Sequence, residues 1–168
     1  MTQDMHPNAA LIERFYVAFA RHDWEAMAAC YHPDVHFSDE VFDLHGADAV
    51  AMWRMLCTSG KALHVKARDI AADDRQGQAH WDARYRFSAT NRPVVNRIDA
   101  AFEFGDGLIV RHVDRFDFWH WSRQALGTRG LLLGWTPLLR RKVRAAAAAS
   151  LEAFKDRLAA KKDAATPA

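Results

Sequence analysis

Apolar residues in the first third of the chain follow the spacing of helices. Within residues 8–22 they recur at every fourth position, which is the pattern of an amphipathic helix. Asp23 can cap a second, shorter helix over residues 24–31, which a following proline prevents from continuing. Residues 35–46 are typical of a short strand and loop, and residues 46–60 predict a third helix between two glycines. Three helices therefore precede the main sheet.

Beyond residue 61 the hydrophobic period changes to two, which is the period of a strand. Trp81 and Tyr85 alternate with charged residues, so one face of their strand is expected to lie inside the protein. A Gly-Asp-Gly turn indicates a hairpin between the last two strands, and the whole segment predicts an antiparallel meander. The expected strands cover residues 63–73, 78–90, 93–104 and 107–121.

Helices followed by a curved antiparallel sheet predict an α+β fold in which the N-terminal helices cover one face and enclose a cone. We expect residues 1–125 to form this cone domain, residues 126–162 to add an apolar segment and a helix that pack on it, and residues 163–168 to form a loose tail. The run GLLLGWTPLL at 130–139 is too apolar for an exposed loop, so it should close the mouth of the cone or form a dimer interface. The basic cluster at 140–144 is expected to be solvated.

Composition favours one soluble domain. The chain of 168 residues is 50% hydrophobic, which is enough for a single core, and its formal charge of +2 does not demand a nucleic-acid partner. Cys30 and Cys57 lack the spacing of metal ligands, so no metal site is expected. The start of the chain lacks the apolar run of a signal peptide, and no run is long enough to span a bilayer. We therefore expect a cytoplasmic protein without a membrane partner.

The stretch HVDRFDFWHW at residues 112–121 supplies candidate chemistry. As a strand, it places His112, Asp114 and Phe116 on one face. A carboxylate in apolar company is costly unless something pairs with it or uses it, so Asp114 is a candidate base with His112 as its partner. A slip of one residue in register would turn Val113 inward instead.

Residues 8–122 together resemble a known superfamily. The stretches DWEAMAACYHPDVHFSDE and FEFGDGLIVRHVDRFD look like elements of the nuclear transport factor 2-like superfamily, and within it of the SnoaL-like group. Polyketide cyclases, ketosteroid isomerase and limonene epoxide hydrolase share this fold, and the superfamily also contains proteins without catalysis. The resemblance implies a cone-shaped domain, a small hydrophobic ligand and a homodimer.

The resemblance to the isomerase places Asp39 at the position of the catalytic base, after the first strand. The tyrosine donor of the isomerase corresponds to Phe15, whereas Tyr16 points about 100° away around the helix. The position of its second donor is Ala100 or, on another alignment, Asp99, and the alternation of the strand favours Ala100. Both donors would then be missing, which argues against steroid isomerisation.

The resemblance to the cyclase and the epoxide hydrolase implies an aspartate on the last long strand, at Asp114. The hydrolase also needs an Arg-x-Asp triplet on a neighbouring strand, but Arg97 and Asp99 are expected to face outward. The residues expected to contact a ligand inside the cone are Phe15, Tyr16, Trp53, Trp81, Tyr85 and Phe116.

Two hypotheses about function remain. In the first, the protein is a small isomerase, cyclase or hydrolase that acts on a hydrophobic carbonyl compound without a cofactor, with Asp114 or Asp39 as the base and His112 beside it. In the second, it is a non-catalytic ligand-binding or dimerisation module. Under that hypothesis His112 is a structural histidine and Asp39 caps a turn.

Overall fold

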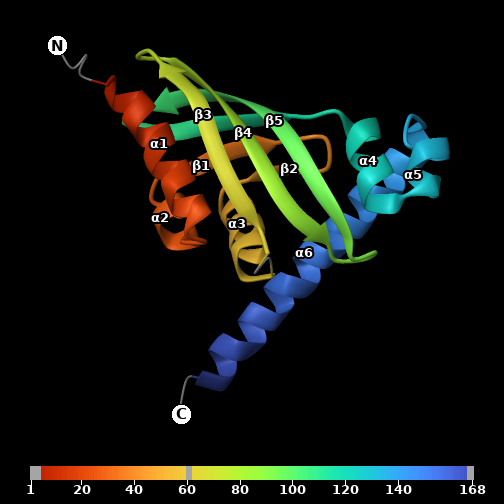
Figure 1. The fold of residues 1–168 in the computed structure, drawn as a ribbon. Helices are drawn as coiled ribbons and strands as arrows, with labels where there is room; N and C mark the ends of the chain where they lie inside the picture. The colour runs from red at the N-terminus through yellow and green to blue at the C-terminus, as the bar shows by residue number, and fades with distance from the viewer. Residues whose placement is uncertain (1–4, 60–61, 166–168) are drawn as a thin grey trace.

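The computed structural model describes residues 5–59 and 62–165 and has an α+β architecture (Figure 1). Its elements in chain order are α1 (Pro7–Ala20), α2 (Trp24–Ala28), β1 (Tyr31–Ser38), β2 (Asp43–His45), α3 (Ala47–Ser59), β3 (His64–Ala72), β4 (Gln76–Phe87), β5 (Arg92–Gly105), β6 (Leu108–Arg115), α4 (Phe118–Leu126), α5 (Thr128–Leu133) and α6 (Pro137–Ala165).

The six strands form one open, curved sheet in the order β2-β1-β6-β5-β4-β3. In Figure 1, α1, α2 and α3 lie together near one end of the sheet, and α4 and α5 lie at the opposite end. The α+β cone expected from the sequence is therefore confirmed. The antiparallel meander expected beyond residue 61 is confirmed in β3, β4, β5 and β6, and β1 pairs with β6 in parallel.

The register of β6 turns its polar residues into the cone. His112 pairs with Phe102 and Asp114 with Ala100, and all four side chains are buried. The register shifts between Glu103 and Phe104 on β5, which is the mark of a bulge. The inward assignment expected for His112 and Asp114 is thus the one that the fold adopts.

The prediction that a strand continues to residue 121 is wrong. The strand ends at Arg115, and α4 begins at Phe118, where the side chain of Asp117 accepts a hydrogen bond from the backbone N–H of His120. Phe118, Trp121 and Ala125 are buried at helical spacing. The cap and this spacing override the strand-like alternation of the sequence.

The C-terminal segment leaves the cone as a long helix. Leu151 and Phe154 of α6 are buried, and Leu151 belongs to the core of the cone. The leucines of residues 131–133 are exposed, so this run does not close the mouth of the cone in the way the sequence suggested. Helix α6 also includes residues 163–165, which were expected to be loose, whereas 166–168 lie outside the described residues.

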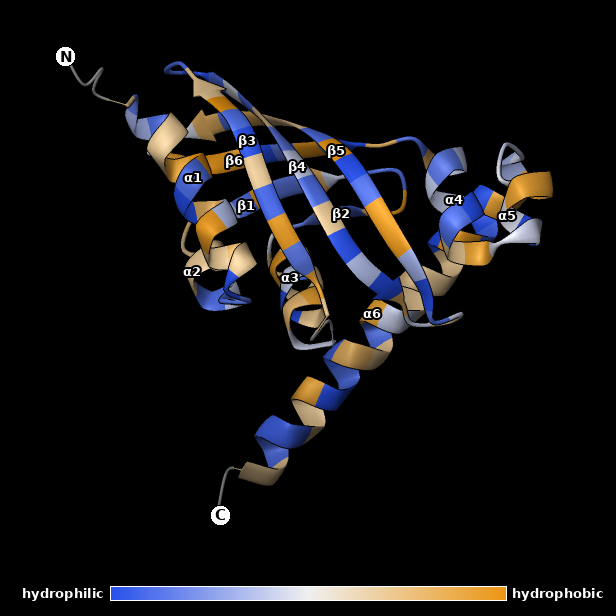
Figure 2. Ribbon diagram, in the orientation of Figure 1, coloured by the Kyte–Doolittle hydropathy of each residue, from blue (hydrophilic) through white to orange (hydrophobic). Residues whose placement is uncertain are grey.

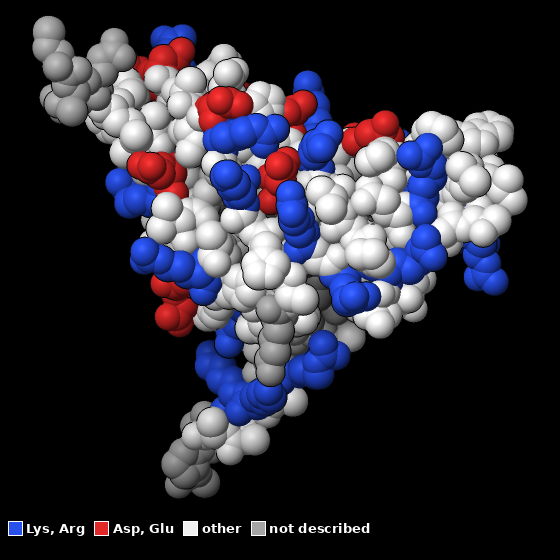
Figure 3. Space-filling model, viewed as in Figure 1, with Lys and Arg blue, Asp and Glu red and all other residues white. Residues whose placement is uncertain are grey.

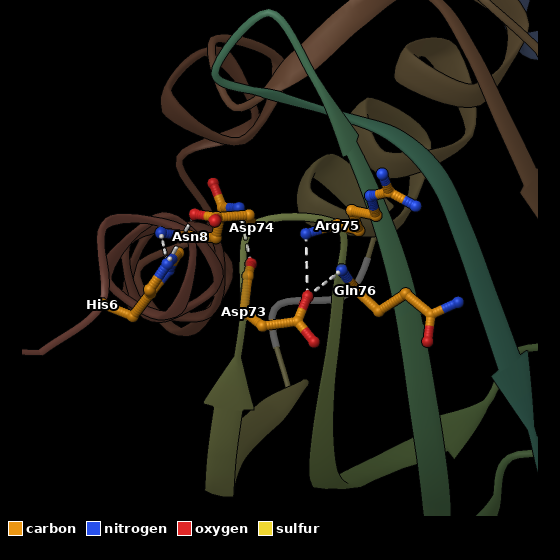
Figure 4. A network of polar contacts seen from close by, with 6 residues as sticks. All are labelled: His6, Asn8, Asp73, Asp74, Arg75 and Gln76. Carbon is orange, nitrogen blue, oxygen red and sulfur yellow. Dashed lines mark hydrogen bonds and ion pairs between the residues drawn. The ribbon is translucent and has the colours of Figure 1, made fainter.

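The start of α1 is tied to the turn between β3 and β4 (Figure 4). His6 Nε2 lies 3.1 Å from an oxygen of Asp74, and the side-chain amide of Asn8 donates to the carbonyl of Asp73 at 2.8 Å. The carboxylate of Asp73 accepts the backbone N–H groups of Gln76 and Arg75, which lower its pKa. These bonds fix the helix that supplies Phe15 and Tyr16 against the sheet.

Hydropathy does not indicate a membrane span. Within residues 5–59 and 62–165, no helix combines the length and the apolar character that crossing a bilayer requires.

Replacing Asp117 by alanine tests the start of α4. Loss of the cap should lower the free energy of unfolding by about 1 kcal/mol, measured by urea denaturation. Asp156→Ala is the matched control, because Asp156 is exposed in α6, and it should change stability by less than about 0.5 kcal/mol. Equal effects of the two substitutions would contradict the capping role of Asp117.

Candidate functional site

Two side chains of β6 form a buried acid–histidine pair. His112 Nε2 lies 3.0 Å from Asp114 Oδ1, with the side chains only 0% and 3% exposed. Trp81 of β4 donates its indole N–H to the same carboxylate oxygen at 3.2 Å. The structure therefore places Asp114, His112 and Trp81 together, as the sequence suggested.

Tyr31 extends this pair on the other side of the imidazole. Its hydroxyl lies 2.7 Å from His112 Nδ1 and accepts the indole N–H of Trp53 at 2.9 Å. Because the carboxylate of Asp114 can only accept, the facing Nε2 of His112 is assigned the proton, and Nδ1 then accepts the hydroxyl proton of Tyr31. Asp114 then accepts two N–H donors, which suits a carboxylate. We refer to Trp53, Tyr31, His112, Asp114 and Trp81 as the buried polar chain.

Aromatic rings enclose the imidazole. The ring centroid of Phe102 lies 4.4 Å from that of His112, and the centroids of Phe37 and Phe15 lie at 5.2 and 5.5 Å. The indole of Trp53 stacks on it at 5.8 Å. Water is excluded from this surrounding, so the hydrogen bonds of the polar chain are stronger than they would be at the surface.

Tyr16 lies in the same interior without a polar partner. Its hydroxyl is buried and makes no hydrogen bond with any residue that the structure describes. Burial raises the pKa of Tyr16 well above its ordinary value, and the negative charge of Asp114 raises it further. Tyr16 is therefore a neutral hydrogen-bond donor in the interior of the cone, and its ring lies 5.9 Å from that of Trp81.

Asp39 lies just beyond the end of β1 and is half-buried. Its carboxylate accepts the backbone N–H groups of Val41 and Phe42, each at 2.6 Å, so it caps the turn that leads to β2. Burial raises the pKa of Asp39 to about 7, the two backbone hydrogen bonds oppose this rise, and the charge of Asp114 adds to it. A carboxyl group of this kind is partly protonated near neutral pH and can act as either acid or base.

Two more of the expected ligand contacts lie toward α4. Tyr85 accepts the indole N–H of Trp121 at 2.8 Å, and its pKa is raised mainly by burial. Phe116 follows the end of β6 and packs against both the core of the cone and the smaller apolar cluster under α4. Both side chains are half-buried, so together with Asp39 they form the less enclosed part of the site.

The inner end of the site is filled by its own side chains. Phe15, Tyr16, Trp53 and Trp81 are all buried. One surface pocket of about 240 Å³ lies on the opposite face of the sheet, where Arg111, Val113 and neighbouring residues of β4 and β5 line it. A ligand in the cone therefore has to displace side chains that the structure shows in contact.

Three side chains on the outer face could hold a metal ion. His36 and His45 face each other across β1 and β2 with their rings stacked at 4.2 Å, and Asp43 accepts from or shares a proton with His36 at 2.6 Å. The donor atoms of His36, Asp43 and His45 all lie within 4.8 Å of one another. Imidazole and carboxylate are suitable ligands for zinc and other divalent transition metals. This cluster lies on the side of the sheet away from the buried polar chain.

Sequence reasoning missed Tyr31, the central hydroxyl of the polar chain. Its apolar neighbours and helical spacing suggested the end of the second helix, whereas Tyr31 begins β1. The signal that could have found it is Pro33, because a residue before proline favours extended backbone, and His32 therefore argues for a strand at this place.

Removal of the Tyr31 hydroxyl and removal of the Tyr16 hydroxyl are predicted to have opposite effects on stability. Tyr31→Phe leaves the indole of Trp53 and the Nδ1 of His112 unpaired inside the core, which should cost about 2 kcal/mol of unfolding free energy or more. Tyr16→Phe removes a hydroxyl that has no partner, so stability should stay unchanged or rise. Urea denaturation compares the two, and a larger loss in Tyr16→Phe would contradict the polar chain as described.

The pKa of Asp39 predicts a dependence of stability on pH. Its folded value of about 7 lies above the ordinary value of 3.8, so the folded chain binds more protons between these limits. The resulting stabilisation is complete below about pH 4 and is lost as the pH rises through about 7. Asp39→Asn keeps an acceptor for the two backbone N–H groups, and it should gain stability relative to the unsubstituted chain between pH 5 and 8. If the difference in unfolding free energy between Asp39→Asn and the unsubstituted chain stayed constant from pH 5 to 8, a raised pKa of Asp39 would be excluded.

Comparisons with known proteins agree with the geometry. A family model described as the SnoaL-like domain matches residues 12–112. A candidate polyketide cyclase from Xanthomonas campestris pv. campestris is 24% identical, with a TM-score of 0.60 over 70% of this chain and 96% of that one. An epoxide hydrolase from M. tuberculosis is 21% identical, with a TM-score of 0.59 over 75% and 92%.

A nuclear transport factor 2-like protein of unknown function from Burkholderia pseudomallei has a TM-score of 0.63 at 19% identity, over 71% of this chain and 98% of that one. These likenesses concern the fold, and none of the curated protein sequences matches the chain. The family model covers more than half of the sequence, and the curved sheet and its covering helices have the expected form. The chain therefore belongs to the family of the SnoaL-like domain, and it shares its fold with nuclear transport factor 2-like proteins.

Proposed function

We propose that this protein binds a small hydrophobic carbonyl compound in its cone and acts on it with Asp114 as the base. The observation that carries the proposal is that the same aromatic interior holds a buried carboxylate, Asp114, and a buried hydroxyl without a partner among the described residues, that of Tyr16. A fold shared with a candidate polyketide cyclase and an epoxide hydrolase supports a small organic ligand.

The proposed step is removal of a proton from the carbon next to the carbonyl group. Among the described hydrogen bonds, those of Asp114 go to Oδ1, so Oδ2 is the atom proposed to take the proton. The C–H electron pair becomes the C=C bond of an enolate, whose oxygen would accept a hydrogen bond from Tyr16. Where the carbonyl compound also carries a neighbouring C=C bond, the enolate is a dienolate, and return of the proton from Asp114 to its far carbon gives the isomer. Attack of the enolate carbon on a second carbonyl closes a ring, and the alkoxide formed there takes the proton from Asp114.

His112 is proposed as a positioning residue. Its Nε2 fixes one oxygen of Asp114, while Tyr31 fixes its Nδ1. Because these two hydrogen bonds fix the orientation of the Asp114 carboxylate, it does not have to reorient when it receives the proton.

The half-buried residues are proposed to admit the ligand. Tyr85 and Phe116 would have to turn aside, and Asp39 lies beside them with a pKa near neutrality. Asp39 could then exchange the transferred proton with solvent, which gives the two carboxyl groups different tasks. Trp53 and Trp81 would form apolar walls while their N–H groups remain bound in the polar chain.

A non-catalytic binding module is the second candidate. It is favoured by the closed packing of the inner end, where all members of the polar chain are hydrogen-bonded. The resemblance to the isomerase also implies that Phe15 stands where that enzyme has a donor tyrosine. In this case the chain would hold a ligand near Tyr85 and Phe116 without turning it over, and the two candidates differ in whether a bound ketone exchanges protons.

Solvent-deuterium exchange at the carbon next to the carbonyl group tests the proposed function. A panel of cyclic and aromatic ketones would be screened by NMR for binding and for exchange in D₂O. Asp114→Asn should lower the exchange rate of a bound ketone by at least about 100-fold, because a general base contributes that much. Asp99→Asn is the control, since Asp99 faces outward and pairs with His80.

The outcomes separate the two candidates. Exchange that depends on Asp114 supports the enzyme. Ligand binding without exchange supports the binding module, and exchange that survives in Asp114→Asn removes this residue as the base.

A further inference from the structure

The end of the molecule formed by α5 and the start of α6 exposes an unusual amount of apolar surface. Trp135 is 75% exposed and Leu132 is 63% exposed. We define the α5–α6 tip as the exposed large side chains of Leu131, Leu132, Leu133, Trp135 and Leu138. Figure 2 shows hydrophobic colour on the outer side of α5, at the end of the molecule farthest from α1. A contiguous apolar patch of this kind marks an interaction surface.

Close packing below the tip holds these side chains outward. A Cβ atom at Gly130 would lie 1.8 Å from the carbonyl oxygen of Ser122, and one at Gly134 would lie 2.1 Å from the Ser122 hydroxyl, so only glycine fits at these contacts. The indole of Trp135 donates to the carbonyl of Leu132 at 3.1 Å. The tip is therefore a shaped surface built on α4, and its leucines are not free to fold back.

The start of α6 is also anchored. Arg140 pairs with Glu40, and its guanidinium lies 4.8 Å from the ring centroid of Phe118. Arg144 donates to the backbone carbonyl of Glu40 at 2.9 Å. The loop between β1 and β2 thus fixes the direction in which the tip points away from the cone.

The segment that carries the tip has charges of one sign, although Glu40 of another segment pairs with its Arg140. Between Asp117 and Glu152 the sequence contains no acidic residue. The same segment carries Arg123, Arg129, Arg140, Arg141, Lys142 and Arg144. Arg129, Arg141 and Lys142 are exposed, and Figure 3 shows basic side chains beside the uncharged surface at this end of the molecule. A partner that covers the tip therefore meets an apolar centre with a basic border.

The apolar centre and the basic border of the tip distinguish between two candidate partners, a second copy of the chain and a lipid surface. A second copy in a two-fold interface would bring each basic border against the same border of its partner, which is unfavourable. An anionic lipid surface offers apolar depth for leucines, an interfacial layer that suits tryptophan, and negative headgroups for Arg and Lys. We propose that the α5–α6 tip docks the protein on an anionic membrane surface.

Docking of this kind differs from spanning and departs from our expectation of no membrane partner. The side chains would enter only the headgroup and upper acyl region, and no long apolar helix is needed. The inference does not depend on the proposed function, because none of the tip residues belongs to the buried polar chain.

Vesicle co-sedimentation of the full chain tests the proposal. Phosphatidylcholine vesicles with and without phosphatidylglycerol serve as probes, and binding should require the anionic lipid and weaken as salt increases. The double variant Leu132→Ser/Trp135→Ser should bind anionic vesicles at least about tenfold more weakly. Arg141→Gln/Lys142→Gln should also weaken binding by about tenfold or more and reduce its salt dependence.

Exposed positions on the sheet provide the controls. Val95→Ser and Arg97→Gln change an exposed apolar and an exposed basic side chain of β5, and both should bind as the unsubstituted chain does. Circular dichroism and thermal unfolding should show that all variants fold, because every substituted side chain is exposed.

Two results would overturn the proposal. One is the absence of binding to anionic vesicles, or binding that the tip variant retains. The other is a dimer in analytical ultracentrifugation that Leu132→Ser/Trp135→Ser dissociates, which would assign the tip to a second copy of the chain.

Discussion

A carboxylate inside an aromatic cone has to be paired, and the structure is organised around the way Asp114 meets this requirement. An unpaired buried charge would cost several kcal/mol. Asp114 instead accepts N–H groups from His112 and Trp81, and His112 is completed by Tyr31. Trp81 thereby joins β4 to β6 and Tyr31 joins β1 to β6, while Trp53 links α3 to the chain through the Tyr31 hydroxyl.

The interior of the cone contains two kinds of polar group. The members of the polar chain have hydrogen-bond partners and are therefore held rigidly, which suits positioning. The hydroxyl of Tyr16 has no partner among the described residues, which suits binding of a ligand. Under the proposed function, Asp114 is the base that the polar chain holds in place and Tyr16 is the free donor, and both are buried in the cone. The closed packing around them is the feature that a ligand has to overcome.

Much of this arrangement could be predicted from the sequence. The alternation around Trp81 and the short turn before β6 were enough to direct Asp114 and His112 inward, because a strand has only two faces and one of them carries aromatic residues. The role of Tyr31 could not be predicted in this way, since it depends on a parallel contact between β1 and β6, which lie far apart in the sequence. The same holds for α4, where one capping carboxylate at Asp117 outweighs the alternation of the residues that follow.

The α5–α6 tip shows a different limit of sequence reasoning. Its leucines were expected to be covered because exposed apolar runs are rare, but glycines at 130 and 134 pack on Ser122 and leave them outside. The local pattern identifies such a run as unusual, and only the three-dimensional packing shows that none of the described residues covers it.

The direction of the protons in the buried polar chain is the most direct test of this account. A long-range ¹H–¹⁵N NMR spectrum near pH 8 reports which nitrogen of His112 carries the proton, with Tyr31→Phe as the sample that assigns the signal. The hydrogen bonds of the polar chain predict a proton on Nε2, with Nδ1 as the acceptor from Tyr31. A proton on Nδ1 and none on Nε2 would mean that His112 does not donate to Asp114, and it would contradict the network on which the proposed base depends.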